Sequence, residues 1–324
     1  MAILPIIKSL SNRDYKVYTL SVYEKHKDIA SFENGAINLT IGENINTLHL
    51  KNNIFSKFYK MCIRSFKIYR NIKKYDIDFV ISSGDGLTIS SLIAKVYIHF
   101  LSIFNLKSNK NKKSVLFYAY IHENLKNISS VNRFILKHIL RYADNIICVS
   151  DGLSQSVKHF IRNTRDNKVL TIYNTFENNN IKKEDHILEA DRNKNGKAYI
   201  EGKEIIFLCV GRLEKVKGYE SLIKSFASFI KAPISLHIIG EGNERKNLEE
   251  LISKLKLNNK VKLLGSMDSD SVYANLRGAY AFINNSKYET FGVSLIEAMS
   301  MGVPIIINDC EYGPKEIYRK AVTT

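Results

Sequence analysis

The chain has 324 residues, of which 45% are hydrophobic, and it carries a formal net charge of +16. The length is enough for two domains with hydrophobic cores, and the hydrophobic share excludes a wholly disordered chain. The four cysteines lie far apart without the spacing of metal ligands, so we expect reduced thiols in a cytosolic protein.

The first half of the chain alternates short apolar runs with helical patterns. Residues 2–10 have the pattern of a helix. The runs that predict strands are 17–22, 79–82, 115–120, 145–149 and 168–172. Such runs separated by helices indicate a parallel sheet. We therefore expect residues 1–180 to form one doubly wound α/β domain, with all five strands in its first sheet.

The second half repeats this alternation after a polar interruption. Residues 177–203 keep no apolar period, which places a linker at 181–203. Beyond the linker, strands are predicted at 205–210, 235–239, 261–264 and 280–284, with helices between them. The sequence thus predicts a second doubly wound domain over residues 204–324.

One apolar segment, Leu87–Leu106, is long enough to span a bilayer. Lys95 and His99 lie at its middle, and a central lysine is costly within a membrane. The preceding S-S-G-D-G has the form of a strand-to-helix turn, so we expect a buried helix of the first domain.

The positive charge is concentrated in residues 51–150, which hold 17 basic and 5 acidic residues. Within the segment 51–74, lysines and arginines alternate with aromatic and aliphatic residues in a basic amphipathic pattern. Such a helix suits an anionic membrane surface, and nucleic acid is a second possible partner. A third interpretation is a solvated helix whose apolar side packs on its own sheet.

Residues 289–297 read E-T-F-G-V-S-L-I-E and place two carboxylates around a predicted turn-to-helix junction. Gly292 lets the backbone approach a ligand, and the helix start offers free N–H groups to an anion such as a diphosphate. Glu297, inside the helix, could accept hydrogen bonds from a ribose diol. The alternative is a surface helix with two solvated glutamates.

A second motif follows the predicted strand 205–210, where F-L-C-V-G-R-L-E-K-V-K ends an apolar run in glycine and basic residues. Arg212 and Lys217 would lie at the carboxyl end of that strand, where open α/β sheets bind ligands, and both suit phosphate contacts. The alternative for Arg212 is an ion pair with Glu214 or Glu220.

Three motifs in this order resemble the family 4 glycosyltransferases: G-R-L-x-x-x-K-G at 211–218, I-I-G-E-G at 238–242, and E-T-F-G-V-S-L-I-E-A-M-S-M-G-V-P at 289–304. The resemblance is strong over about residues 205–316. It implies the GT-B architecture, in which two Rossmann-like domains face each other across a cleft and the C-terminal domain holds a nucleotide-sugar donor.

The resemblance also implies roles for individual residues. Arg212 and Lys217 would neutralise the donor diphosphate, Glu297 would bind the ribose, and Glu289 would contact the transferred sugar. The N–H groups of Phe291, Gly292 and Val293 would point at the phosphates or the sugar. The residues expected to border the base are Gly240, Glu241 and Gly242.

In the first domain, His122 in Y-A-Y-I-H-E-N matches a cleft-facing histidine of similar enzymes and is the second candidate catalytic residue beside Glu289. Its alternative role is to satisfy a backbone carbonyl at a strand end. No metal is expected. Asp268-Ser-Asp270 and Asp76-Ile-Asp78 have the form of a D-x-D metal motif, but their context favours a helix cap and a strand start.

The chain also departs from the family pattern at both ends. A first strand with its glycine-rich loop, and further helix after residue 324, are expected of similar chains, so we expect a truncated family member.

The predicted function is a retaining, metal-independent transfer of a hexose or N-acetylhexosamine, most simply from a UDP-sugar, with no cofactor. The acceptor would be a bacterial surface polysaccharide or a lipid-linked oligosaccharide at the inner face of the cell membrane, with no nucleic acid partner. The alternatives are a sugar phosphorylase or epimerase, or a non-catalytic nucleotide-sugar binding protein or inactive fragment.

Overall fold

The computed structural model describes residues 16, 18–21, 37–40, 54–104, 114–161, 168–174, 204–310 and 312–323. The chain divides into an N-terminal unit, Met1–Tyr173, and a C-terminal unit, Asn174–Thr324. The predicted helix at 2–10 and the predicted linker at 181–203 lie outside the described residues.

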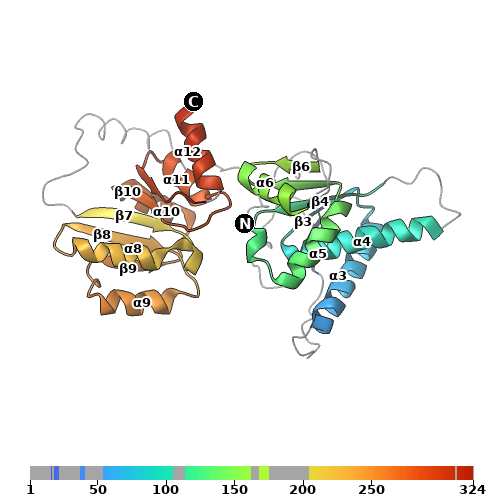
Figure 1. Ribbon diagram of the computed structural model, residues 1–324, viewed down its shortest axis with the longest axis horizontal. Coiled ribbons are helices and arrows are strands. Elements are labelled where there is room, and N and C mark those ends of the chain that lie inside the picture. The colour runs from blue at the N-terminus through green and yellow to red at the C-terminus, as the bar shows by residue number, and fades with distance from the viewer. Residues whose placement is uncertain are drawn as a thin grey trace. The chain divides into compact units, whose positions relative to one another are not determined.

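Four parallel strands in the order β3-β4-β5-β6 form the main sheet of the N-terminal unit (Figure 1). Their bounds are Phe79–Ser83, Leu116–Ile121, Asn145–Cys148 and Val169–Thr171. All four agree with the predicted strands to within one or two residues. The sheet core is apolar, with Phe117, Ile146 and Leu153 almost fully buried.

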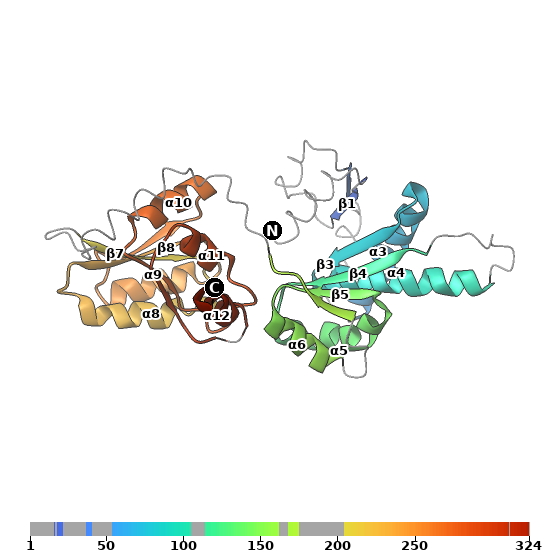
Figure 2. The same ribbon diagram turned by 90° about the horizontal axis from the view of Figure 1, so that it is seen from above.

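Three helices connect these strands: α4 (Asp85–Phe104), α5 (Ser130–Ile139) and α6 (Asp151–Phe160). Each joins neighbouring parallel strands in the same direction, so right-handed crossovers place all three on one face. Figure 2 shows α5 and α6 together on one side of the strands.

One expectation for this sheet was wrong. The predicted strand at 17–22 exists as β1 (Tyr18–Ser21), but it pairs in parallel with β2 (Ile37–Thr40) in a separate two-stranded sheet. The β2 segment, I-N-L-T, is too short to give a clear alternating pattern. Because β2 takes up hydrogen bonds of β1, this strand does not extend the four-stranded sheet.

Helix α3 (Ile54–Tyr75) carries the basic segment and packs against α4. Its buried stripe has helical spacing and consists of Met61, Ser65, Ile68 and Ile72. This confirms that one side of the helix packs within its own unit. Lys51 lies outside the described residues.

Helix α4 contains most of the apolar segment Leu87–Leu106, which is long enough to span a bilayer. Lys95, at its middle, forms an ion pair with Asp144 at 2.6 Å and lies over the Phe117 ring. A lysine paired with the loop before β5 indicates a helix packed on its sheet. Over the described residues, the structure contains no helix with the length and apolarity to cross a bilayer.

The C-terminal unit contains five parallel strands in the order β11-β10-β7-β8-β9 (Figure 1). Their bounds are Ile305–Ile307, Ala281–Asn284, Ile205–Val210, Ile234–Ile239 and Val261–Gly265. The strand β11 was not predicted; the other four were, to within one residue.

Helices cover both faces of this sheet, and Figure 2 shows α8 and α10 on opposite sides of β7 and β8. The helices are α8 (Tyr219–Phe226), α9 (Arg245–Lys254), α10 (Ser269–Gly278), α11 (Val293–Ser300) and α12 (Gly313–Thr323). One core cluster joins α8 and α9 to the sheet, and a second joins α10 and α11 to it. The fully buried Ile223 and Leu295 anchor the two clusters, and burial of each side chain contributes about 1.5–3 kcal/mol.

The strand order reverses beside β7. From β7 the chain moves to β8 and β9 on one side, and α10 then returns it to β10 on the other side of β7. Ligands of open α/β sheets bind at such a switch point, outside the carboxyl ends of the strands. The loops after β7 and β10 are therefore where the fold offers a site.

Candidate functional site at the ends of two strands

Two of the predicted site residues meet at this switch point. Lys217, at the end of the loop after β7, donates from Nζ to Glu289 Oε2 at 2.5 Å, and Glu289 follows β10. The side chains are only 18% and 15% exposed. Because both groups are largely shielded from water, their Coulomb attraction is stronger than that of a surface pair, and it holds the two side chains together.

The loop after β7 is held in place by the loop after β8, which contains Gly240, Glu241 and Gly242. Leu213 N donates to Glu241 O at 2.9 Å, and Glu244 N donates to Leu213 O at 3.0 Å. A Cβ at Gly240 would lie 2.0 Å from Gly211 O, and one at Gly242 would lie 2.4 Å from Leu213 O. Glycine is required because the two backbones touch. Their predicted contact with a base stays a prediction.

The loop after β10 binds the other side of the β7 loop through residues that the sequence analysis missed. Asn285 Nδ2 donates to Gly218 O at 2.7 Å, and Lys287 N donates to Val216 O at 2.8 Å. A run of polar residues directly after a predicted strand was the signal that could have found them. They connect the segments that carry Lys217 and Glu289.

Tyr219 also supports this loop from the start of α8. Its hydroxyl donates to Gly211 O at 3.3 Å. Burial raises the pKa of Tyr219, and the neighbouring Cys209 and Glu289 raise it further, so the hydroxyl keeps its proton.

The N-terminus of α11 lies beside Glu289. Its N-cap is Gly292, which has a left-handed backbone (φ 94°) and brings no capping side chain. Leu295 N already donates to Gly292 O at 3.0 Å, whereas the N–H groups of Val293 and Ser294 make no hydrogen bond within the described residues and are open to an anion. The Glu289 side chain packs against Gly292, with Cγ 3.5 Å from a Cβ built there. The Phe291 side chain is buried, so any ligand contact of Phe291 would come from its backbone.

Glu297 lies in α11 and is half-buried. Within the described part of the chain, its carboxylate makes no hydrogen bond or ion pair. Burial raises the pKa of Glu297, and its charge in turn helps to raise the pKa of the neighbouring Tyr273. A half-buried carboxylate in this state can accept hydrogen bonds from a ligand.

Arg212 takes the ion pair that was considered as its alternative role, with Nη1 2.7 Å from Glu214 Oε1. The arginine side chain is 75% exposed. An exposed pair of this kind is weak and leaves guanidinium N–H groups for a ligand. The structure thus keeps both roles of Arg212 open.

His122 follows β4 in the N-terminal unit. Its Nδ1 lies 3.3 Å from Ser83 Oγ, its Nε2 lies 3.8 Å from Glu123 Oε1, and its ring stacks on Tyr120. Burial raises the pKa of Tyr120 to about 12. The ring borders a small cavity at the carboxyl end of β3 and β4. Its role in acceptor or sugar binding stays a prediction.

The two D-x-D segments act as their context indicated. Asp268 is the N-cap of α10 and accepts from Ser271 N at 2.8 Å, which lowers the pKa of Asp268. Asp76 and Asp78 precede β3. Among the described residues, no group of three or more His, Cys, Asp or Glu is arranged to hold a metal ion. All four cysteines carry free thiols, as predicted.

Comparison with known proteins places this site in a family. Residues 190–324 match the profile of the glycosyl transferases group 1. The C-terminal part of the chain is thus similar to the group 1 glycosyltransferases. The matched range contains all the candidate site residues of the C-terminal unit, from Arg212 to Glu297. It confirms the resemblance that the motifs indicated.

Individual relatives agree with this match. An uncharacterized glycosyltransferase of Methanocaldococcus jannaschii is 28% identical over 269 residues, which cover 80% of this chain and 62% of the relative. An N-acetylgalactosamine-N,N'-diacetylbacillosaminyl-diphospho-undecaprenol 4-alpha-N-acetylgalactosaminyltransferase of Campylobacter jejuni is 30% identical over 194 residues, which cover 59% of this chain and 48% of the relative. The chain thus spans at most 62% of the length of these two relatives.

Solved structures confirm the fold. A protein of Anabaena in complex with UDP and glucose superposes with a TM-score of 0.71 at 17% identity, covering 98% of this chain and 79% of that protein. Both units are Rossmann-like, and the chain matches structures of the GT-B fold, as the sequence predicted.

Proposed function

We propose that this chain is the main part of a retaining glycosyltransferase that uses a nucleotide diphosphate sugar, with UDP as the favoured nucleotide. The observation that carries the proposal is the Lys217–Glu289 pair beside the uncapped N-terminus of α11. A diphosphate and a sugar hydroxyl need such neighbours, a fixed cation with free N–H groups and a fixed carboxylate. The UDP-bound structural relative supports the choice of nucleotide.

The chemistry follows from the charges. A lysine ammonium has three donors, so Lys217 can bind Glu289 with one and a donor phosphate oxygen with another. The leaving diphosphate gains negative charge in the transition state, where Lys217, the exposed Arg212 and the α11 N–H groups stabilise it. These groups would serve in place of a metal ion.

Glu297 would bind the ribose. Its unpartnered carboxylate has no hydrogen-bond donor within the described chain, and a ribose diol supplies two. This accounts for a half-buried acidic group that the fold itself does not use.

Retention of configuration would come from attack on the same face as the departing diphosphate. Glu289 is a poor nucleophile because Lys217 compensates its charge. We assign it to the hydroxyls of the transferred hexose or N-acetylhexosamine. His122 would orient the acceptor or the sugar.

The acceptor would be a lipid-linked oligosaccharide or a surface polysaccharide, as the name of the Campylobacter relative suggests. The outer face of α3 supports this choice. Beside its lysines and arginines it exposes the aromatic residues Tyr59 and Phe66, and α4 adds Tyr97 and Phe100. Basic and aromatic residues together favour an anionic lipid surface, so the protein would be peripheral on the inner face of the membrane.

A turnover assay tests the proposal. The chain is incubated with UDP-glucose, UDP-galactose and their N-acetyl forms, with and without lipid-linked acceptors, and nucleoside diphosphate is measured. We expect release only with acceptor, insensitivity to EDTA and retention of the anomeric configuration. Glu289→Gln should abolish release, whereas Glu250→Gln, at an exposed position of α9, should not. If the chain binds a nucleotide sugar but releases no nucleoside diphosphate with any acceptor, the non-catalytic alternative is favoured.

A further inference from the structure

A groove between α5 and α6 in the N-terminal unit shares no lining residue with the candidate donor site or with the cavity beside His122. It has a volume of about 580 Å³ and is lined by Ser130, Arg133, Phe134, Lys137, His159 and Phe160. This volume lies within the range of about 300–1,000 Å³ that small-molecule sites occupy.

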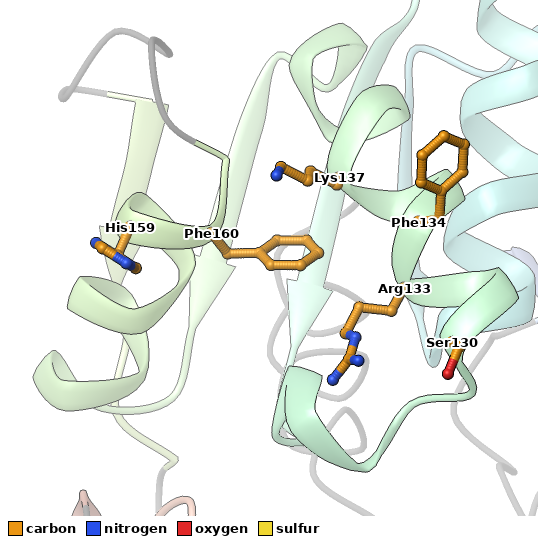
Figure 3. A pocket seen from close by; sticks show the side chains of 6 residues that line it. All are labelled: Ser130, Arg133, Phe134, Lys137, His159 and Phe160. Carbon is orange, nitrogen blue, oxygen red and sulfur yellow. The ribbon is translucent and has the colours of Figure 1, made fainter.

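The view in Figure 3 shows how its side chains are arranged. Phe160 extends from the end of α6 toward α5, and Lys137 and Arg133 of α5 lie on either side of its ring. The groove therefore has an aromatic floor with a cation on each side.

The two cations are four residues apart on α5, where like charges repel each other. Within the described part of the chain, neither forms an ion pair with a carboxylate and no acidic residue lines the groove. An anion between Arg133 and Lys137 would relieve this repulsion. A phosphate monoester carries a charge of about −1.5 to −2 at neutral pH, which matches the two positive charges.

We propose that this groove binds a phosphate-headed lipid, with the phosphate on Arg133 and Lys137 and the hydrocarbon on Phe160. The exposed Phe134, on the same helix, extends the apolar surface available to the chain. A second copy of this protein is a poor occupant, because its strong net positive charge would repel the cations Arg133 and Lys137 in the groove. The inference does not depend on the proposed donor chemistry.

Calorimetric titration with soluble short-chain lipids tests the inference. The probe is dihexanoyl phosphatidic acid below its micelle concentration. Dihexanoyl phosphatidylcholine has the same chains without net charge, and glycerol 3-phosphate has the phosphate without the chains. We expect saturable binding of the first, weaker by about tenfold or more for each of the other two.

Variants locate the site. Arg133→Ala, Lys137→Ala and Phe160→Leu should each weaken binding of the phosphatidic acid about tenfold. The matched control is Lys158→Ala, which removes an exposed charge on α6 that does not line the groove. Saturating UDP should also leave this binding unchanged, which separates the groove from the donor site.

Three results would overturn the inference: binding insensitive to the Arg133 and Lys137 changes, binding lost in the presence of saturating UDP, or equal affinity for glycerol 3-phosphate. Preference for a nucleotide or an acidic peptide over the lipid at this groove would also overturn it.

Discussion

Lys217 and Glu289 are separated by 72 positions in the sequence, yet they form one largely buried ion pair. The relationship exists because β7 and β10 are neighbours at the point where the strand order reverses. It joins a residue proposed for the donor diphosphate to one proposed for the transferred sugar. Binding of the diphosphate to Lys217 would therefore change the electrostatic environment and position of Glu289, which would bind the sugar, and the reverse also holds.

Breaking this pair on one side should destabilise the fold. Lys217→Met leaves the Glu289 carboxylate in a largely desolvated position, and we expect a loss of about 3 kcal/mol in the free energy of unfolding. Glu289→Gln removes the counter-charge of Lys217, but it should cost less because the amide oxygen can still accept the hydrogen bond from Lys217 Nζ. Urea denaturation of both variants and the double variant gives the coupling energy. A coupling near zero would show that the pair does not form in solution.

Glu297 gives a prediction that separates binding from stability. Burial raises its pKa in the folded chain above the value of about 4.3 for an exposed glutamate. The folded chain therefore holds the proton more tightly than the unfolded chain. The stability that proton binding by Glu297 adds to the fold is fully present below about pH 4.3, and it is lost as the pH rises through the raised pKa.

Glu297→Gln should accordingly raise the melting temperature at pH 7, with a smaller gain at pH 4, while it weakens UDP binding about tenfold. Glu250→Gln on α9 serves as the control for a change of charge at an exposed position. A lower melting temperature at pH 7 for Glu297→Gln would show that the carboxylate has a stabilising partner.

The start of α12 sets the position of the predicted phosphate-binding backbone. A Cβ at Gly313 would lie 2.2 Å from Phe291 O and 2.4 Å from Phe291 Cα. Gly313→Ala must therefore push α12 and the Phe291–Gly292 backbone apart, at about 1–3 kcal/mol, and it should weaken nucleotide binding. Thermal denaturation and UDP titration check both effects.

Gly278→Ala is the matched control for that change. Gly278 ends α10, and a Cβ there would meet nothing within 4 Å. We expect a stability change between zero and a gain of about 1 kcal/mol, with normal UDP binding. Equal damage by the two substitutions would show that Gly313 has no special role.

Membrane association should depend on the outer face of α3. Arg70 and Lys74 are exposed and lie opposite the buried stripe of that helix. Each charge near an anionic surface contributes about 1 kcal/mol, so the double change to glutamine should weaken binding to phosphatidylglycerol vesicles about thirtyfold. Sedimentation of the protein with these vesicles measures the bound fraction. Equal binding by the double variant and by Lys246→Gln on α9 would exclude α3 as the membrane contact.

Much of the fold follows from local sequence. Runs such as Ile205–Val210 are apolar enough to identify buried parallel strands, and a change to polar residues marks their ends. The three-residue strand Ile305–Ile307 was missed because it is short and follows a proline. The pairing of β1 with β2 was missed because strand partners are set by contacts between distant segments.

The candidate site was predicted one residue at a time, and its internal contacts were not. The sequence placed Lys217 and Glu289 each at the end of a strand, but only the strand order makes these ends neighbours. Likewise, the assignment of Gly240 and Gly242 to a base stays a prediction, and their packing against the backbone at Gly211 and Leu213 was not predicted. Such contacts depend on how loops pack, which no local pattern encodes.

Calorimetric titration of UDP and GDP into the chain tests the central claim most directly, with Lys217→Ala and Glu297→Ala as variants and Glu250→Gln as control. We predict one UDP per chain, with binding reduced at least about tenfold in both variants and unchanged in the control. Failure of the folded chain to bind either nucleotide, or equal binding by all variants, would contradict the assignment of the donor site to the ends of β7 and β10.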